Sequence, residues 1–350
     1  KTFKPTLFDF LANNALTFYE TSETSITKPA YQFKIDSPTY LSDANVFSNL
    51  KITSKDSLSL QLHALNIYQK LIAFHQKENN INALVSNDIE RLKFVHQHAI
   101  FDTKENVLIA TLRSAKENYK NHEASGLYAF EIAKKHQEKA SLTAKTENKK
   151  AIHICNEIIA KFPKSLGATK CKILKSQIEE KSLSIIAEEY IPIGKNSKIL
   201  VTYKNVESLF FTAYFITKKE ELELNKIYNY EDKKVYINKL QKVTTWKHLL
   251  RNELDYLEHT TEVIVPKFEN GTYIIVASES EKGDENYIYG TSTIQVTNLT
   301  LVENTFNDKY NYQIVDRNTG KPIKNAEIYL KNNSTHEDSY INKKLNWSKQ

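Results

Sequence analysis

The spacing of apolar residues along this 350-residue chain changes once, near Ser182. Before that point apolar residues recur every three or four positions, as in the series Leu60, Ala64, Ile67 and Leu71. This spacing places them on one face of an α-helix. After Ser182 apolar and polar residues alternate, as in SKILVTYKNV and GTYIIVASE, which is the spacing of half-buried β-strands. The sequence therefore predicts an α+β multidomain protein with its helices first and its strands second.

The helical region is expected to be an antiparallel array, because amphipathic helices joined by short loops can bury their apolar faces only against one another. Thr6 and Asp9 have the spacing of a helix N-cap and a capping box. The last two helices, AIHICNEIIAKF and SLGATKCKILKSQIEE, flank Pro163 and resemble tetratricopeptide-like helical hairpins. No strict repeat of constant period is found, so the prediction for residues 1–181 is a helical array.

The strand-rich region is expected to form an antiparallel β-sandwich at residues 182–298, because short alternating segments separated by turns favour that architecture. One helical insert, KKVYINKLQKVTTWKHLL, is expected to interrupt it. Residues 299–350 are too few for a complete sandwich, which needs about 100 residues. We expect them to be the incomplete start of a second β domain.

The segment YQIVDRNTGKPIKNAEIYL, residues 312–330, is predicted to be a hairpin with a structural turn. Asp316 can accept hydrogen bonds from the turn backbone, Gly320 can adopt a positive φ, and Pro322 fixes the return of the chain. Each of the three residues thus has a structural role, and the turn is not expected to be a binding site.

Charge and hydropathy restrict the expected partners. The chain has 48 Lys and Arg residues against 42 Asp and Glu residues, a net charge of +6, and the two signs are interspersed. A nucleic-acid-binding protein would show a basic stripe with stacking aromatic residues, so no nucleic-acid partner is expected. No run approaches the ~18 apolar residues of a membrane span, and none is expected in this chain. Because the chain begins at Lys1, we expect a signal peptide or lipid anchor to be removed or not included.

Common catalytic motifs do not occur in the sequence, including G-x-S-x-G, H-E-x-x-H and the phosphate-binding loop. His96 and His98 form an H-x-H pair, but residues two apart on a helix point in different directions. The carboxylates lie in polar surroundings, which favours solvated surfaces over active sites. The sequence therefore predicts no metal, no cofactor and no enzymatic activity.

The two cysteines, Cys155 and Cys171, lie on the apolar faces of the last two predicted helices. Both are expected to face the inside of the same helical hairpin. Two states are compatible with this placement. The residues could be buried free thiols, or they could form a disulfide in an oxidising compartment if their Cα atoms lie within about 7 Å of each other.

Five segments have an order along the chain that resembles a known family. The helical half contributes PTLFDFLANNALTFY and AIHICNEIIAKFPKSLGATKCKILKSQI, and the strand half contributes ILVTYKNVESLFFTAYFI, VPKFENGTYIIVAS and YQIVDRNTGKPIKNAEIYL. In this order they resemble the N-terminal part of bacterial alpha-2-macroglobulin-family proteins of the Bacteroidetes type. The resemblance implies that residues 182–298 are a macroglobulin-like β-sandwich and that residues 299–350 begin a second one.

The resemblance also implies a function. Members of the family are extracytoplasmic proteins that trap proteases after a bait segment is cut, and in many a thioester formed by a Cys-x-Glu-Gln run captures the protease. Here CNEI at residues 155–158 has Ile158 in place of the Gln, so no thioester can form there. The resemblance places the bait and the thioester outside this chain. The chain would be a non-catalytic scaffold region of a periplasmic or cell-surface endopeptidase inhibitor. Its partners would be target proteases, through the intact protein, and an envelope protein at the helical array.

Two other functions fit the same sequence pattern. A cell-surface or periplasmic module built from helical repeats and a β-sandwich could bind a peptide or a glycan. A concave groove lined by exposed Tyr and Trp would favour that alternative. The chain could also be an accessory domain of a hydrolase, and a catalytic domain encoded after residue 350 would favour that function.

Overall fold

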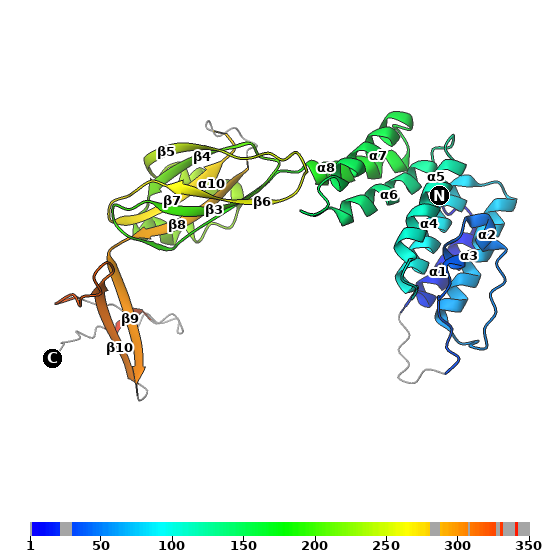
Figure 1. The fold of residues 1–350 in the computed structure, drawn as a ribbon, viewed down its shortest axis with the longest axis horizontal. Coiled ribbons are helices and arrows are strands. Elements are labelled where there is room, and N and C mark those ends of the chain that lie inside the picture. The colour runs from blue at the N-terminus through cyan, green and yellow to red at the C-terminus, as the bar shows by residue number, and fades with distance from the viewer. Residues whose placement is uncertain are drawn as a thin grey trace. The chain divides into compact units, whose positions relative to one another are not determined.

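A computed structural model describes residues 2–21, 30–280, 288–306 and 309–326, and the backbone of residues 330–331 and 340–341. The chain divides into two compact units. The first contains Lys1–Glu180 and Glu253–Leu257, and the second contains Lys181–Asn252 and Glu258–Gln350. The helices-then-strands architecture predicted from the apolar spacing is confirmed (Figure 1).

The first unit is built from helices. In chain order they are α1 (Leu7–Tyr19), the 3₁₀ helix η1 (Pro38–Leu41), α2 (Ala44–Ser48), α3 (Leu60–Lys77), α4 (Ile81–His98), α5 (Lys104–Asn118), α6 (Ser125–Lys139), α7 (Glu147–Lys161) and α8 (Leu166–Glu179). Consecutive long helices pack against each other from α3 to α8. Their short connections turn each helix back along the previous one.

Side-chain caps fix where several of these helices begin. The predicted cap at Thr6 is confirmed, because its hydroxyl accepts the backbone N–H of Asp9 and the Asp9 carboxylate accepts the backbone N–H of Thr6. Ser59 caps α3 by accepting the N–H of Leu62, and Ser165 caps α8 by accepting the N–H of Ala168. Each cap satisfies a backbone donor that the first turn of a helix leaves free.

Two hydrophobic clusters form the core of the first unit. The larger cluster joins α1 to α6 and contains fully buried residues such as Leu41, Phe47, Leu65 and Leu71. The smaller cluster joins α6, α7 and α8 and is rich in small side chains: Ala129, Ala133, Ala151, Ala168, Cys155 and Cys171. Small side chains allow the three helices to approach closely.

α6 and α8 approach each other closely at Gly126 and Gly167. A Cβ atom added to Gly167 would lie 2.5 Å from the carbonyl carbon and 2.8 Å from the Cα of Gly126. Real Cβ atoms do not come this close to backbone atoms, so the crossing requires a residue without a side chain at position 167.

Residues Glu253–Leu257 lie between two strands in the sequence but belong to the first unit. The side-chain amide of Asn148 on α7 donates to the carbonyl oxygens of Asp255 (3.3 Å) and Tyr256 (3.0 Å). Tyr256 also packs against the small-residue cluster of α6 to α8. These contacts fasten the segment to α7.

The second unit contains two sheets. The three-stranded sheet has the order β1 (Ser182–Ala187), β3 (Ser197–Lys204), β6 (His259–Val265). The five-stranded sheet has the order β2 (Tyr190–Ile191), β8 (Tyr289–Val296), β7 (Gly271–Ser278), β4 (Ser208–Phe215), β5 (Gln241–Leu249). This strand order is that of an immunoglobulin-like sandwich, with one extra short strand beside β8.

Alternate residues of both sheets form the sandwich core. Val201 of β3, Phe211 of β4 and Ile275 of β7 are fully buried, and all belong to one cluster. In the five-stranded sheet Phe211 pairs with Trp246 of β5, and their rings stack with centroids 5.0 Å apart. The alternation of buried and exposed residues explains why the period of two was visible in the sequence.

Two details of the sandwich differ from the prediction. The sheet is not wholly antiparallel, because β2 pairs with β8 in parallel through Tyr190↔Gln295 and Ile191↔Val296. The predicted helical insert at residues 233–250 was also wrong for its second half. Only α10 (Tyr230–Ile237) is helical there. Residues Gln241–Leu249 form β5, which pairs with β4. The β-branched residues Val243, Thr244 and Thr245 favour a strand at this position.

A short helix that the sequence analysis missed, α9 (Lys218–Leu224), precedes α10. Leu224 of α9 and Ile237 of α10 form a cluster with Ile274 of β7. The two helices thus cover part of the outer face of the five-stranded sheet. This cluster is separate from the sandwich core.

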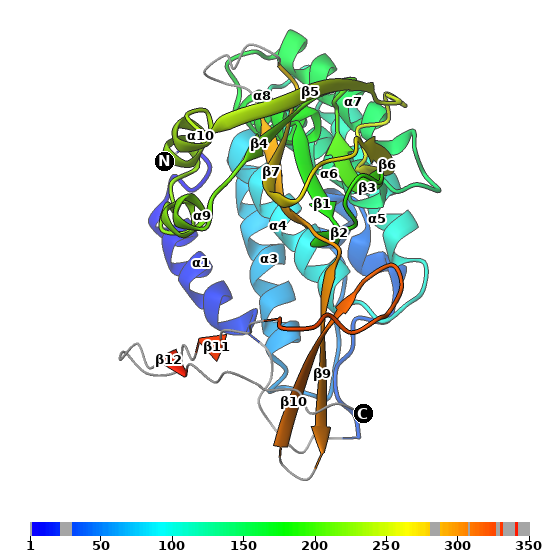
Figure 2. The ribbon, with the colours of Figure 1, turned by 90° about the vertical axis from the view of Figure 1, so that its left-hand side faces the viewer.

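Beyond the sandwich, β9 (Leu299–Phe306) and β10 (Lys309–Asp316) form an antiparallel hairpin (Figure 2). Two further short strands, β11 (Leu330–Lys331) and β12 (Tyr340–Ile341), pair with each other. Residues 327–329, 332–339 and 342–350 lie outside the described residues. The expected second macroglobulin-like domain at residues 299–350 therefore stays a prediction.

Candidate functional site

The candidate site is a cleft of about 210 Å³ formed by three helices of the first unit, α4, α5 and α6. Ile89, Leu92, Leu108 and Leu112 belong to its lining and are buried. Its remaining lining is mostly charged or polar: Lys93, His96, Gln97, Glu131, Lys134, Lys135 and Glu138. The cleft therefore combines an aliphatic floor with a charged rim.

Helical spacing produces this arrangement. The lining residues of α6 (131, 134, 135 and 138) are three or four positions apart. Those of α4 (89, 92, 93 and 96) follow the same spacing, and so do those of α5 (108 and 112). Residues at this spacing lie on one face of a helix, so each helix turns one continuous stripe toward the cleft.

Ion pairs connect the three helices around the rim. Lys93 of α4 pairs with Glu131 of α6. His96 of α4 lies 2.7 Å from Glu105 of α5, measured from Nε2 to Oε2. Lys135 of α6 lies 3.9 Å from the same carboxylate oxygen. The rim therefore carries both signs of charge, with three lysines and two glutamates among its lining residues.

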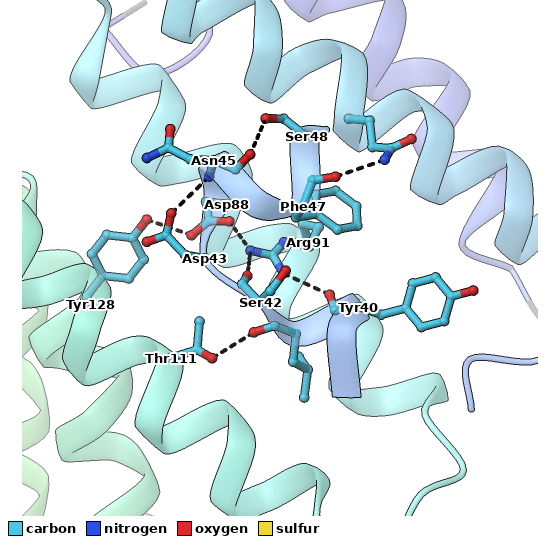
Figure 3. A network of polar contacts seen from close by, with 12 residues as sticks. Tyr40, Ser42, Asp43, Asn45, Phe47, Ser48, Asp88, Arg91, Thr111 and Tyr128 are labelled. Carbon is cyan, nitrogen blue, oxygen red and sulfur yellow. Dashed lines mark hydrogen bonds and ion pairs between the residues drawn. The ribbon is translucent and has the colours of Figure 1, made fainter. Parts of the chain in front are cut away.

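A buried network of charged and polar groups connects α4, α6 and the segment that contains η1 and α2 (Figure 3). Arg91 and Asp88 of α4 form an ion pair with both side chains fully buried. The other Asp88 oxygen accepts a hydrogen bond of 2.7 Å from the hydroxyl of Tyr128 on α6. Burial first, and then the Asp88 carboxylate, raise the pKa of Tyr128 well above its usual value. Tyr128 is therefore protonated at physiological pH and acts as a hydrogen-bond donor.

Arg91 also fastens the segment that contains η1 and α2. Its two terminal nitrogens each donate 2.9 Å hydrogen bonds, one to the carbonyl oxygen of Tyr40 and one to that of Ser42. Its guanidinium carbon lies 4.5 Å from the ring centroid of Phe47. These contacts hold residues 40–47 against α4, as Figure 3 shows.

A second buried charged contact fastens α1 to α3. Nε2 of His75 lies 2.6 Å from Oδ1 of Asp9, with 1% and 0% of the two side chains exposed. Burial alone would raise the pKa of Asp9, but hydrogen bonds from Thr6 and His75 lower it below its usual value. The pair has the residue types of a catalytic acid–base dyad. Its complete burial closes it off from substrate, so its role here is structural.

The two cysteines come together in the smaller cluster of the first unit. Both are free and fully buried in one cluster, where each thiol shifts the pKa of the other. By contrast, His96 and His98 are directed to different partners, Glu105 and Gln61. Among the described residues, no group of three or more His, Cys, Asp or Glu side chains could hold a metal ion.

The turn after β10 uses the three residues singled out in the sequence. Asp316 accepts the backbone N–H groups of Asn318 (3.1 Å) and Thr319 (2.8 Å), and these bonds, together with one from the Thr319 hydroxyl, lower its pKa. Gly320 has a φ of +68°. Pro322 forms an isolated bridge with Val315. Along its full length β10 pairs with β9. On its other edge the returning chain begins to pair with the end of β10, because the Asp316 N–H donates to the carbonyl of Lys321 and the Ile323 N–H donates to the carbonyl of Ile314, each at 2.9 Å. Residues 327–329 of the predicted return strand lie outside the described residues.

The sequence analysis did not identify the cleft or the buried charged network. One signal was present, because Asp88 and Arg91 stand three residues apart in a helical run that also contains the apolar residues Val85, Ile89, Leu92 and Val95. A charged pair at this spacing can satisfy itself inside a core. The lining of the cleft comes from three helices, and no spacing within a single segment predicts which helices will meet.

Among the helices that the structure describes, none is both long and apolar enough to cross a lipid bilayer.

No protein-family model and no curated protein matches this chain. Among solved structures, the chain is similar to native alpha-2-macroglobulin from Escherichia coli spanning domains MG0-NIE-MG1, with a TM-score of 0.33 and 12% identity over 45% of this chain and 54% of that chain. A structure spanning NIE-MG1 of the same protein gives a TM-score of 0.27 and 9% identity over 41% and 73%. The CARDB domain of the PF1109 protein from Pyrococcus furiosus, in complex with di-metal ions, gives 0.19 and 14% over 34% and 90%.

These likenesses are partial. The chain spans about half of the first Escherichia coli fragment, 54% of its length. All three TM-scores are below 0.5, so the likenesses by themselves assign neither a family nor a function. Both alpha-2-macroglobulin fragments come from Escherichia coli, and the resemblance to the Bacteroidetes type stays a prediction.

Proposed function

We propose that this chain is a non-catalytic scaffold region of an alpha-2-macroglobulin-like protease-trapping protein. The observation that carries the proposal is that the segments resembling this family each form a distinct part of the architecture. PTLFDFLANNALTFY forms the capped helix α1, and AIHICNEIIAKFPKSLGATKCKILKSQI forms the α7–α8 hairpin. ILVTYKNVESLFFTAYFI forms β3 and β4, and VPKFENGTYIIVAS includes β7. A helical array thus precedes one sandwich, in the order that the resemblance implies.

The use of buried charges supports a scaffold role. Asp9 and His75 fasten α1 to α3, and Asp88 and Arg91 fasten the η1–α2 segment to α4. In both pairs the side chains are closed off from solvent. These interactions therefore stabilise the packing of the elements that they join, and neither pair is accessible to a substrate.

The environment of CNEI at residues 155–158 agrees with the view that this run is not a reactive centre. Cys155 is fully buried, and Ile158 is 4% exposed in the same cluster. Both residues lie on α7, whose buried face packs against α6 and α8. The bait segment and any thioester belong, under this proposal, to parts of the protein outside residues 1–350.

The proposal includes a location and partners. The protein would act outside the cytoplasm, in the periplasm or at the cell surface. Target proteases would be bound by the intact protein, and this chain would contribute its scaffold. The first unit would contact a protein of the cell envelope.

An inhibition assay tests the scaffold role. The purified chain is incubated with a panel of endopeptidases of different specificity, and cleavage of a protein substrate is followed. We expect the cleavage rate to equal that of each protease alone. Stoichiometric inhibition by residues 1–350 would contradict the proposal, since it would place a reactive segment within this chain.

The cleft between α4, α5 and α6 has no Tyr or Trp in its lining, so it lacks the feature expected of a peptide- or glycan-binding groove, but its shape suits one apolar side chain of a protein partner. Its floor is aliphatic and its volume of about 210 Å³ is below the roughly 300–1,000 Å³ of typical small-molecule sites. It is large enough for an apolar side chain that protrudes from a partner. A Lys134→Glu and Lys135→Glu double variant would weaken such a contact without changing the core, and binding to envelope extracts measured against the unaltered chain tests this.

A further inference from the structure

We propose that Cys155 and Cys171 form an intramolecular disulfide that links α7 to α8 when the protein meets a disulfide donor. The two residues lie on consecutive helices joined by a turn of four residues, 162–165. Nothing in the proposed scaffold function requires this bond. It is a separate modification site in the core of the first unit.

The positions of the two residues match across the hairpin. Cys155 lies six residues before the end of α7 at Lys161, and Cys171 lies five residues after the start of α8 at Leu166. With a rise of about 1.5 Å per residue, both lie at roughly the same height above the turn, about 8 to 9 Å. Both side chains are fully buried in the same small cluster of α6, α7 and α8, and each thiol shifts the pKa of the other, so the two side chains are neighbours.

Small residues lie beside the pair on both helices. A disulfide needs Cα atoms about 4.4 to 6.8 Å apart, which is closer than the usual 8 to 10 Å between packed helix axes. Ala151 on α7 and Ala168 on α8 are fully buried beside the pair. Gly167, one turn before Cys171, makes backbone contact with α6. Small side chains thus flank the pair, in a cluster that also contains Ile158 and Leu174.

The electrostatic surroundings distinguish the two thiols. The hydrogen bond from Cys171 lowers the pKa of Cys155 against the effect of burial, and the Lys175 ammonium group lowers it further. The same hydrogen bond, together with burial, raises the pKa of Cys171. We assign the first attack on a disulfide donor to Cys155, because the Lys175 ammonium group favours its thiolate and the thiolate is the nucleophile in this reaction.

The reaction is two thiol–disulfide exchanges. The Cys155 thiolate attacks one sulfur of a donor RSSR, which forms a mixed disulfide and expels one RS⁻. Cys171 then gives up its proton and attacks the Cys155 sulfur, which forms the Cys155–Cys171 bond and expels the second RS⁻. RSSR is reduced to two RSH, and the protein loses two hydrogens. Because both thiols are buried, local opening of the α7–α8 hairpin must precede the first step.

Mass spectrometry of the whole chain provides the test. The reduced protein is equilibrated in glutathione buffers of increasing oxidised fraction, quenched with acid and digested. We expect a mass loss of two hydrogens and a cross-linked peptide pair that contains both cysteines. Persistence of two free thiols through the whole buffer series would overturn the proposal. So would a stable glutathione adduct on either residue.

Thermal unfolding gives an independent measurement. Closing a loop of about 15 residues is expected to raise the midpoint of unfolding of the first unit by roughly 6 to 12 °C relative to the reduced protein. A Cys155→Ala and Cys171→Ala double variant should show no difference between oxidised and reduced buffers. If the unaltered protein showed no difference either, the bond would not form in the folded state.

Discussion

Arg91 illustrates how single residues connect irregular segments to the helices of the first unit. Residues 40–47 contain η1 and the short helix α2, and this segment relies on a side chain of another helix to hold the carbonyls of Tyr40 and Ser42. Arg91 supplies donors to both carbonyls while its charge is balanced by Asp88. A guanidinium group suits this role because it offers five donors in a fixed plane.

Replacing Arg91 by Leu is expected to lower the free energy of unfolding of the first unit by about 3 to 5 kcal/mol, because Asp88 would remain buried without its counter-charge. Urea unfolding followed by far-UV circular dichroism measures this. The exposed Lys70→Met on α3 is the matched control and should change the free energy by less than about 0.5 kcal/mol. Adding Asp88→Leu to Arg91→Leu should recover part of the loss. If Arg91→Leu behaved like the control, the buried pair would have no structural role.

The Asp9–His75 contact makes stability depend on pH. The pKa of Asp9 is lower in the folded protein than the value of about 3.9 expected after unfolding. The stabilisation is therefore fully present above the unfolded pKa, and it is lost as the pH falls through the folded pKa. Asp9→Asn should unfold more easily at pH 6 and should lose less stability than the unaltered protein between pH 5 and pH 3.

Unfolding by urea at several pH values in this range provides the measurement. Asp102→Asn, at an exposed position of the same unit, is the control and should follow the pH dependence of the unaltered protein. An equal loss of stability in Asp9→Asn and in the unaltered protein would contradict the assignment of this pH dependence to Asp9.

At the scale of elements, the spacing of apolar residues predicted whether a segment is a helix or a strand better than it predicted where that segment ends. The helical stripe Leu60, Ala64, Ile67, Leu71 and the alternation in SKILVTYKNV each correspond to one element, α3 and β3. The segment 233–250 was misassigned because its apolar residues also fit a helix over a short stretch. Pairing with β4 decides the structure of residues 241–249, and this pairing is a long-range contact that local spacing does not contain.

The glycine contact between α6 and α8 was not predicted either. A glycine lowers the helix propensity of the segment that contains it, so packing must explain why a glycine stands at position 167 of α8. Gly167→Ala is expected to destabilise the first unit by about 1 to 3 kcal/mol, because the added Cβ would lie 2.5 to 2.8 Å from backbone atoms of Gly126. Ser176→Ala, exposed on the same helix, is the matched control and should be nearly neutral. A stabilised Gly167→Ala would mean that the helices can separate without loss.

At the scale of the whole molecule, the chain passes between its two units three times, because Glu253–Leu257 belong to the first unit. The sequence boundary near residue 182 marks only one of these passages. The other two passages lie at the two ends of Glu253–Leu257, the five residues that follow β5. Hydrogen bonds from Asn148 to Asp255 and Tyr256 hold this segment in the first unit. A sequence pattern does not reveal such a distant partner.

Asn148→Ala is expected to release this segment. Losing the two hydrogen bonds should cost about 1 to 2 kcal/mol, which corresponds to a roughly 5- to 30-fold faster cleavage by chymotrypsin after Leu254, Tyr256 or Leu257. Limited proteolysis with identification of the fragments measures the rate. Asn156→Ala, exposed on the same helix, should leave the rate unchanged. Equal rates in both variants would show that Asn148 does not hold the segment.

The central claim, that residues 1–350 are scaffold of a protease trap, is tested most directly on the intact protein that contains them. An endopeptidase is mixed with the intact protein, and its activity is measured on a large protein substrate and on a small peptide substrate. We expect activity on the large substrate to fall while activity on the small one persists, since an enclosed protease still admits small molecules. Unchanged activity on both substrates would contradict the claim.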